Sequence, residues 1–353
     1  MDEINVETQP LGIHHVTAIA GDPQKNLDFY SGMLGLRLVK LTINFDDPTT
    51  YHLYYGDGTG NPGTILTFFP WPGASRGRAG TGQASAVAFA IRPASLGYWI
   101  ARLVQHGVPH DGPTRRFGEQ VLSFHDPDGL QVELVAHKPA EAWATMPTGM
   151  LPNEHEIRGF HSVTLWEEGY EQTAQLLTHQ MGFRAAGDEN NVFRYVATGG
   201  DPTSADSAGT PGAPGTIVDV RCAPGFWRGV VAVGTIHHVA FRARNDATQL
   251  ALREQLARQG LNVTPVIDRQ YFHSVYFREP GGVLFEIATD PPGFAVDEPL
   301  DELGTHLKLP PWLEGVRAEL ERVLPPLRRP APRGPGEGGI EPEAHIEVRN
   351  PSI

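Results

Sequence analysis

The sequence predicts an α+β fold made of four copies of one structural module. Similar segments recur at intervals of roughly 70 residues, and repetition at a fixed interval indicates repeated supersecondary units. Each copy begins with a strand-like segment, continues with a helical segment, and ends with two or three strand-like segments that have Gly or Pro at the last turn. The copies, called modules 1 to 4, span residues 11–69, 85–137, 158–224 and 234–290.

Module 4 shows this order of elements clearly. Its first segment is rich in β-branched and aromatic residues, and its helical segment carries Leu252 and Leu256 on one face. The expected elements are a strand at 236–241, a helix that begins at Asn245 or Asp246 and ends at Gly260, and strands at about 271–277 and 283–289. In the last strand Glu286 points away from the face of Phe285 and Ile287, so a carboxylate lies among apolar residues.

The other modules contain helical segments at 25–36, 95–107 and 171–180. A further helix is expected to begin at Pro310 or Pro311 and to end at Pro325, because proline suits only the first turn of a helix. The expected organisation is an N-terminal extension at 1–10, a first domain of modules 1 and 2 at 11–137, a linker at 138–157, a second domain of modules 3 and 4 at 158–292, a C-terminal connection and helix at 293–327, and a disordered Pro- and Gly-rich tail at 328–353.

The composition is typical of a globular protein, and we expect a cytoplasmic one. The chain has 353 residues, of which 40% are hydrophobic and 20% charged. A net charge of -13 without a basic block argues against nucleic acid or an anionic membrane as a partner. Cys222 is the only cysteine, so it is expected in the core rather than in a disulfide or a thiolate metal site. No signal-peptide pattern and no long apolar run occurs, and a homo-oligomer is compatible with the sequence.

Two equivalent positions in the modules carry potential metal ligands. Alignment of the first strands on a shared valine places His15, Ala86, Ser162 and His238 at one position. Alignment of the last strands on their glycine turn places Phe68, Glu133, Val220 and Glu286 at the other. Equivalent residues of two paired modules are expected to face one concave surface. Pairing of modules therefore decides which ligands meet.

Only the pairing of modules 1 and 4 brings three of these ligands together, namely His15, His238 and Glu286. Phe68, at the fourth position, cannot bind a metal. Two histidines and one carboxylate leave three positions of an octahedron open, which is the arrangement that non-heme Fe(II) enzymes use. Mn(II) accepts the same ligands. An alternative that shifts module 3 by one residue would form the triad from His161, His238 and Glu286.

Other histidines and one acid lack the spacing of metal ligands. Glu133 has no ligand partners at the equivalent positions of modules 2 and 3, so it is expected to be structural. The histidines set aside for lack of spacing are His52, His125, His179, His273 and His306.

The chain resembles the vicinal oxygen chelate superfamily, and within it the ring-cleaving dioxygenases that act on hydroquinones. The resemblance covers roughly residues 10–327 and is carried by GIHHVTAIAGD, RGFHSVTL, GTIHHVAF and RQYFHSVYFREPGGVLFEIATD, together with LPPWLE. It implies βαβββ modules paired into two cup-shaped mixed sheets, with the metal in the cup of modules 1 and 4.

The resemblance also implies roles for individual residues. His15, His238 and Glu286 would bind Fe(II). Arg269 and Tyr276 would line the substrate pocket, where Arg269 would stabilise negative charge and Tyr276 would exchange a proton. His14 and His237 would be pocket histidines that take or return a phenolic proton. Successive strand residues face opposite sides, so both members of each histidine pair reach one pocket only if the strand is bulged. Otherwise His14 and His237 would orient their neighbours by hydrogen bonds.

The expected activity is insertion of O2 into a small hydroquinone-type diphenol, next to a carbon that bears a hydroxyl group. Three alternatives remain open from the sequence. A glyoxalase-type isomerase would need no oxygen and would have a fourth protein ligand at the position of Phe68. A catechol-specific extradiol dioxygenase would use the same metal. A metal-free binding or resistance protein of the same fold would hold no metal.

Overall fold

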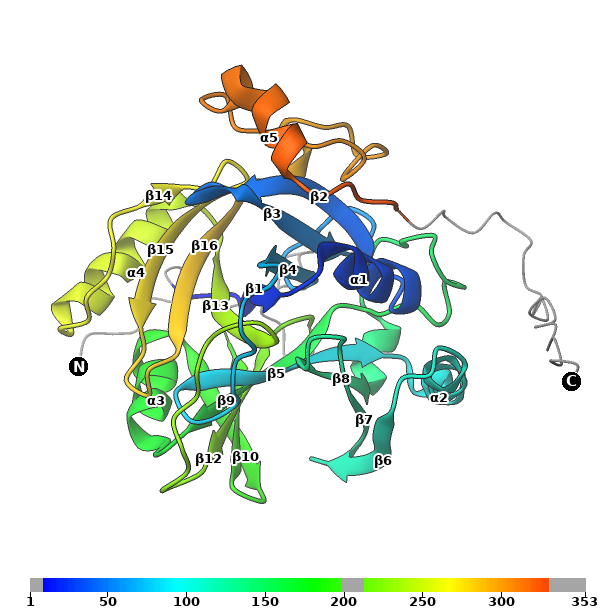
Figure 1. Ribbon diagram of the computed structural model, residues 1–353. Coiled ribbons are helices and arrows are strands. Elements are labelled where there is room, and N and C mark those ends of the chain that lie inside the picture. Colours follow the sequence, from blue (N-terminus) through cyan, green and yellow to red (C-terminus); the bar gives the residue numbers. More distant parts are fainter. Residues whose placement is uncertain (1–8, 199–212, 330–353) are drawn as a thin grey trace, which may run out of the picture.

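The computed structural model describes residues 9–198 and 213–329, whose strands form two curled eight-stranded sheets (Figure 1). The strand order is β14-β15-β16-β13-β1-β4-β3-β2 in the first sheet and β10-β11-β12-β9-β5-β8-β7-β6 in the second. Both sheets are mixed, since β1 runs antiparallel to β13 and parallel to β4. The predicted α+β fold is confirmed. The N-terminal extension up to residue 8 and the tail from residue 330 lie outside the described residues.

The modules pair as predicted, 1 with 4 and 2 with 3. Module 1 contributes β1 (Ile13–Ala20), α1 (Pro23–Leu27), the π-helical turn η2 (Asp28–Met33), β2 (Arg37–Asn44), β3 (Asp47–Gly56) and β4 (Ile65–Pro70). Module 4 contributes β13 (Thr235–Ala243), α4 (Asp246–Arg258), β14 (Ile267–Asp268), β15 (Phe272–Arg278) and β16 (Leu284–Pro292). Each sheet therefore takes one module from residues 11–137 and one from 158–292.

The second sheet is built in the same way. Module 2 contributes β5 (Gln83–Ile91), the short 3-10 helix η3 (Pro93–Ser95), α2 (Leu96–Gln105), β6 (His110–Arg116), β7 (Glu119–His125) and β8 (Gln131–Ala136), followed by η4 (Lys138–Glu141). Module 3 contributes β9 (Phe160–Glu167), α3 (Glu171–Gln175), η5 (Leu176–Gln180), β10 (Phe183–Glu189), β11 (Val192–Ala197) and β12 (Ile217–Cys222). Cys222 is partly exposed at the end of β12 rather than in the core. Its place at the strand end leaves the thiol beside the Glu168 carbonyl instead of apolar neighbours.

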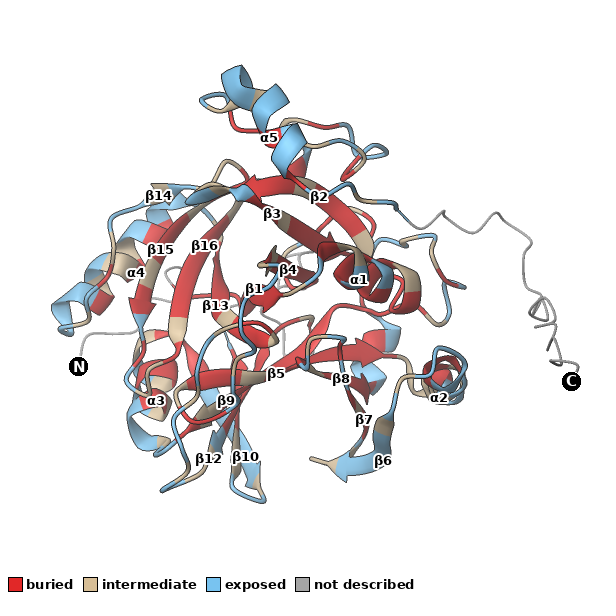
Figure 2. Ribbon diagram, in the orientation of Figure 1, coloured by how far each residue is buried: buried red, intermediate tan, exposed pale blue. Residues whose placement is uncertain are grey.

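The helices follow the local signals in the sequence. Asn245 caps α4 by accepting a hydrogen bond from the backbone N–H of Thr248, and Asp22 caps α1 in the same way. The central strands β1, β13, β5 and β9 are buried along nearly their whole length, whereas the edge strands β6 and β10 and the outer faces of α4 and α5 are exposed (Figure 2). No helix among residues 9–198 and 213–329 is long and apolar enough to cross a membrane.

A C-terminal segment packs across β2 and β3 on the outside of the first sheet (Figure 1). It contains η6 (Phe294–Val296), η7 (Glu314–Val316) and α5 (Arg317–Val323). The prediction that the last helix begins at Pro310 or Pro311 is wrong, because Leu313 N–H donates to the Pro310 carbonyl and closes a turn there. The fully buried Lys40 anchors the segment by donating to Asp297 (2.6 Å) and Glu298 (2.5 Å).

Each first strand carries a β-bulge at the same position. Between β1 and β13 the register skips His14 on one strand and His237 on the other. Between β5 and β9 it skips Ser85 and His161. A bulge leaves its extra residue unpaired and bends the strand, so two successive side chains can approach each other on one side. The bulge that the sequence required for two adjacent pocket histidines is therefore present.

Asp126 joins the two sheets and gives a prediction about pH. Its carboxylate lies in the turn before β8 and accepts a hydrogen bond from the Tyr30 hydroxyl of module 1 (3.0 Å). Burial raises the pKa of Asp126 from 3.8 to about 6. The folded protein therefore keeps this proton at pH values where the unfolded chain has lost it. As pH falls from 7 to 4, Asp126 should stabilise the folded state by about 2 kcal/mol.

We expect Asp126→Asn to remove this contribution. The free energy of unfolding of the native protein, compared with that of the variant, should rise as pH falls from 7 to 4, as measured by urea unfolding at each pH. An energy difference between the two proteins that stays constant over this range would contradict the raised pKa of Asp126.

Candidate metal and substrate site

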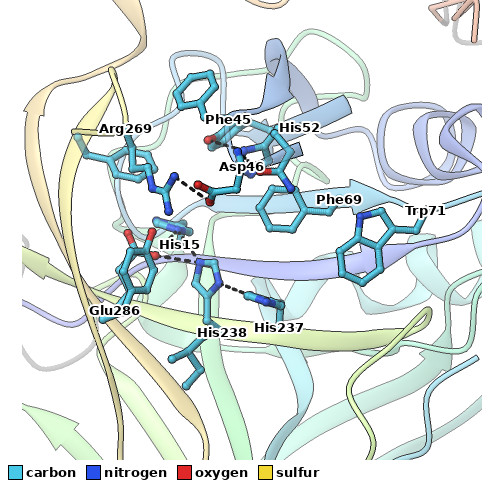
Figure 3. Close-up of a pocket in the computed structure, with 15 residues that line it drawn as sticks. His15, Phe45, Asp46, His52, Phe69, Trp71, His237, His238, Arg269 and Glu286 are labelled. Carbon is cyan, nitrogen blue, oxygen red and sulfur yellow. Dashed lines mark hydrogen bonds and ion pairs between the residues drawn. The ribbon is translucent and has the colours of Figure 1, made fainter. Parts of the chain in front are cut away.

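Three predicted ligands meet on the concave face of the first sheet, on the adjacent strands β1, β13 and β16 (Figure 3). Nε2 of His238 lies 2.9 Å from Oε2 of Glu286, and Nε2 of His15 lies 3.5 Å from the same oxygen. The two Nε2 atoms are 3.4 Å apart. All three side chains are buried. Three electron-pair donors thus surround one point in the protein interior.

The hydrogen bonding of Glu286 shows that these residues fit a metal ion. Its Oε1 accepts a hydrogen bond from the Ser274 hydroxyl (2.5 Å). Its buried Oε2 faces the two imidazole nitrogens and forms no hydrogen bond with the residues that the structure describes. A buried carboxylate oxygen without a donor is costly, and a cation between it and the two imidazoles would satisfy it. The His15 and His238 contacts hold the pKa of Glu286 well below its usual value, against the effect of burial. The carboxylate is therefore ionised, as a metal ligand must be.

The bulged histidines orient the ligand rings. Nδ1 of His14 lies 2.9 Å from Nδ1 of His15, and Nδ1 of His237 lies 2.8 Å from Nδ1 of His238. In the tautomer that leaves Nε2 of a ligand histidine free, its Nδ1 carries the proton and donates to the neighbour. Burial lowers the pKa of His14 well below its usual value and that of His237 to about 3, so both rings are neutral acceptors.

The triad forms one wall of a cavity of about 330 Å³. For comparison, a cavity of about 150 Å³ is enough to hold benzene, so a substituted aromatic ring and a second small molecule fit here. Aromatic side chains dominate the other walls, namely Phe45, Tyr54, Phe69, Trp71 and Phe272. His237 lines the cavity and His14 does not, because His14 packs edge-on against Phe272. The orienting role therefore suits His14 better than a role in contact with substrate.

Arg269 and Tyr276 lie beside the triad as predicted. The Arg269 guanidinium sits 5.6 Å from the centre of the Tyr276 ring and forms an ion pair with Asp46 (3.0 Å) across the cavity mouth (Figure 3). Burial and the nearby Glu286 carboxylate raise the pKa of the Tyr276 hydroxyl well above its usual value. Tyr276 is therefore a protonated hydrogen-bond donor, and Arg269 is a cation held in place.

The cavity is also lined by residues that lack any ligand spacing in the sequence, among them His52. Its ring bridges the hydroxyl groups of Tyr54 and Thr67, both at 2.9 Å. Asp46 and Phe45 come from the turn between β2 and β3. The one sequence pattern that could have indicated this wall is the alternation of His52 and Tyr54 on β3 with residues of the opposite face.

Strand register corrects one of the two alignments of ligand positions. Glu286 pairs with the residue one after the shared valine of its first strand, and so do Thr67, Glu133 and Asp219 in the other modules. The predicted equivalents Phe68 and Val220 are wrong, since Phe68 faces the core and lies 4.5 Å from the Tyr30 ring. The fourth position of the cup is Thr67, whose hydroxyl already bonds Thr17 (2.8 Å) and His52.

A sequence model of the Glyoxalase/Bleomycin resistance protein/Dioxygenase superfamily matches residues 12–134 and 159–287. The chain belongs to this superfamily. The vicinal oxygen chelate resemblance is thereby confirmed.

Relatives in the superfamily are named as ring-cleaving enzymes. MhqO of Bacillus subtilis (strain 168), named "putative ring-cleaving dioxygenase", is 45% identical over 317 residues, covering 90% of this chain and 96% of MhqO. A chlorohydroquinone/hydroquinone 1,2-dioxygenase of Sphingobium indicum is 34% identical over 319 residues, covering 89% of this chain and 95% of that enzyme. The crystal structure of a putative dioxygenase from Bacillus subtilis is 43% identical with a TM-score of 0.81, covering 91% of this chain and 98% of that one. Glyoxalase I from Zea mays, at 14% identity and a TM-score of 0.56, covering 79% of this chain and 92% of that one, shares the fold.

In the second cup, the acids at the positions equivalent to Glu286 form ion pairs with arginines. Glu133 accepts two hydrogen bonds from Arg116, and Asp219 accepts two from Arg194 (both 2.8 Å). Each carboxylate is neutralised by its own guanidinium, so it does not require a metal. This pairing agrees with the prediction that Glu133 is structural.

A second group of potential ligands, formed by Glu119, His137 and His161, lies in the same half of the molecule. It differs from the triad because each oxygen of Glu119 has its own partner. Oε1 contacts Nδ1 of His137 (2.5 Å), and Oε2 contacts Nε2 of His161 (2.9 Å) and Nη1 of Arg194 (3.4 Å). These contacts lower the pKa of Glu119 despite its partial burial. The cluster is satisfied internally, and the nearby guanidinium disfavours a cation.

His161 therefore lies in this cluster, and not beside His238 and Glu286 as the alternative triad required. We expect His15→Ala to lose stoichiometric metal and His161→Ala to keep it, as measured by elemental analysis of the purified proteins after reconstitution. Retention of a full equivalent of metal by His15→Ala would refute the triad. Loss of metal from His161→Ala in a protein with unchanged circular dichroism would restore the alternative.

Proposed function

We propose that this protein is an Fe(II)-dependent ring-cleaving dioxygenase that acts on hydroquinone-type diphenols. The observation that carries the proposal is the convergence of His15, His238 and the unpartnered Oε2 of Glu286 at the wall of an aromatic-lined cavity. Two histidines and one carboxylate leave open positions for an organic oxygen and for O2. The names of the relatives support ring cleavage, and one relative is named for hydroquinone. Mn(II) could occupy the same ligands.

The protein residues would position the substrate and move its protons. When bound, the metal would lower the pKa of the substrate phenol and connect it electronically with O2. The aromatic walls would hold the ring of the diphenol with one of its oxygens at the triad, which supplies proximity. The fixed positive charge of Arg269 would stabilise negative charge that develops on the substrate oxygens. The Tyr276 hydroxyl or the His237 ring, both at the cavity surface, would donate or accept the phenolic proton.

Oxygen uptake tests this function directly. Protein reconstituted anaerobically with Fe(II), and separately with Mn(II), is given hydroquinone, methylhydroquinone, chlorohydroquinone or catechol. We expect one O2 to be consumed per hydroquinone, together with loss of the aromatic absorbance. Absence of uptake with every diphenol, by protein shown to contain iron, would refute the proposal.

The same experiment distinguishes the proposed enzyme from each alternative. A glyoxalase-type isomerase would consume no oxygen, and its fourth ligand position is occupied here by Thr67, whose hydroxyl is engaged by Thr17 and His52. A catechol extradiol dioxygenase would prefer catechol in the substrate panel. A binding protein would turn over none of the diphenols. A cytoplasmic location is part of the proposal and rests on the single cysteine, Cys222.

A further inference from the structure

A chain of neutral hydrogen-bonding groups crosses the concave face of module 1. The hydroxyl of Thr17 lies 2.8 Å from that of Thr67, Thr67 lies 2.9 Å from Nε2 of His52, and Nδ1 of His52 lies 2.9 Å from the Tyr54 hydroxyl. Thr17 and Thr67 are fully buried. His52 and Tyr54 line the cavity. The chain therefore begins in the protein interior and ends at the substrate site.

The equivalent positions of the second sheet carry charged residues. Tyr54 pairs with Thr67 across β3 and β4 as Arg194 pairs with Asp219 across β11 and β12. Arg194 and Asp219 form a buried ion pair that satisfies both groups. In module 1 the equivalent residues are uncharged, and within residues 9–198 and 213–329 the Tyr54 hydroxyl has one hydrogen bond, to His52. The Tyr54 hydroxyl can therefore still bind a ligand.

The hydrogen-bond chain permits the Tyr54 hydroxyl to act either as an acceptor or as a donor toward a ligand. Burial lowers the pKa of His52 well below its usual value, so the ring is neutral and has one N–H and one acceptor nitrogen. If Tyr54 donates to Nδ1 of His52, its oxygen can accept a hydrogen bond from a ligand. In the other tautomer of His52 the ring proton is on Nδ1, and the threonine hydroxyls point the opposite way along the hydrogen-bond chain. Nδ1 of His52 then donates to the Tyr54 oxygen, and the Tyr54 hydroxyl can donate to a ligand. Both directions keep every member of the chain bonded.

We propose that Tyr54 binds the polar group of the substrate that is remote from the metal, and that His52 positions Tyr54 for this contact. This inference rests on the proposed function. The triad lies on β16, β13 and β1. Arg269 and Tyr276 lie on one side of it, just before and on β15, whereas Tyr54 lies on the other side, on β3, two strands beyond β1. The two oxygens of a hydroquinone project from opposite ends of the ring. An oxygen at the triad therefore directs the other oxygen toward a different wall, and Tyr54 is the hydroxyl available there.

The ligand class that this site selects is a phenol with a second hydrogen-bonding group in the para position. Because the chain can reverse, the second group can be a donor, as in hydroquinone, or only an acceptor, as in 4-hydroxybenzaldehyde. A para group without hydrogen-bonding atoms, as in 4-methylphenol, forms no hydrogen bond with Tyr54, so Tyr54 does not increase its affinity.

Anaerobic calorimetric binding to the Fe(II)-loaded protein tests the proposal with these three phenols. In Tyr54→Phe we expect the affinities for hydroquinone and 4-hydroxybenzaldehyde to fall about tenfold, the usual scale for one hydrogen bond. The affinity for 4-methylphenol should change less than about twofold. Tyr51→Phe is the matched control, since its hydroxyl bonds the Pro325 carbonyl outside the cavity. It should bind all three phenols as the native protein does.

His52→Phe keeps an aromatic ring and removes both nitrogens. This variant should have a lower affinity for hydroquinone and an unchanged affinity for 4-methylphenol. A merely structural effect would lower both affinities. If Tyr54→Phe lowers the affinities for all three phenols equally, or changes none of them, the proposal is overturned. Binding without O2 does not depend on turnover. A native protein that binds these phenols selectively but consumes no oxygen would therefore refute the dioxygenase function and leave the role of Tyr54 supported.

Discussion

Glu286→Gln is expected to remove the metal and with it the oxygen uptake. Glu286 supplies the only negative charge of the triad, and its Oε2 is the atom that lacks a hydrogen-bond partner. Glutamine has the same shape, and its amide oxygen can still accept the hydrogen bond from Ser274. Loss of residues that merely support a ligand weakens metal binding 10- to 100-fold. Loss of the charged ligand itself should therefore weaken metal binding and reduce oxygen uptake by more than about 100-fold.

Metal content and oxygen uptake are measured on the same Fe(II)-reconstituted protein. Glu133→Gln is the matched control, because Glu133 occupies the equivalent strand position in the second cup, where it bonds Arg116. This control should keep its metal and its activity per folded molecule. A Glu286→Gln protein with one equivalent of iron would show that the triad is not the metal site.

Lys40→Met is expected to have the largest effect on stability. The Lys40 ammonium is fully buried and bonds Asp297 and Glu298 of the C-terminal segment. Removal of one partner of a buried ion pair leaves the other charge without compensation, which typically costs 3–5 kcal/mol. Urea unfolding should show a loss of about this size. Lys25→Met, at an exposed position of α1, should change stability by less than about 0.5 kcal/mol.

The same variant should also lower activity. Asp297 accepts hydrogen bonds from Gln270 (2.9 Å) and from the Tyr271 hydroxyl (3.0 Å), the two residues that follow Arg269. Release of the C-terminal segment therefore loosens the backbone that places Arg269 at the cavity. A Lys40→Met protein as stable as the native protein would show that this ion pair does not hold the segment.

The sequence was sufficient to predict the modules and their pairing because the ligands themselves select one partner. His15 and His238 sit in strands that begin with the same motif, and Glu286 is an acid where apolar residues are expected. No pairing other than that of modules 1 and 4 assembles all three, and the sheet order agrees.

Phe68 was wrongly predicted to be equivalent to Glu286 because the last turn of module 4 offers two glycines on which the modules can be aligned. Module 4 has two adjacent glycines, and only Gly282 has the positive φ of 108° that a side chain would oppose. Gly63, Gly129 and Gly215 have the same backbone conformation, and each precedes the cup-facing residue by the same distance. Alignment on the conformationally required glycine gives Thr67 rather than Phe68.

Residues of the far wall could not be predicted, because they reach the site through the curl of the sheet. Asp46 meets Arg269 although β2 and β14 are at opposite edges of the same sheet. Periodicity shows which face a residue occupies but not how strongly a sheet bends. His52 and Asp46 were therefore accessible only from the structure.

Because β1 and β16 belong to the first and last modules, the time at which the site forms during protein synthesis is also determined. His15 leaves the ribosome before modules 2 and 3 are made, and Glu286 only after them. The second sheet, built wholly from intermediate residues, can assemble first. Closure of the first sheet must then join distant ends of the chain, a slow step. Incomplete chains that end before module 4 possess only His15 of the triad, so they lack the complete metal site.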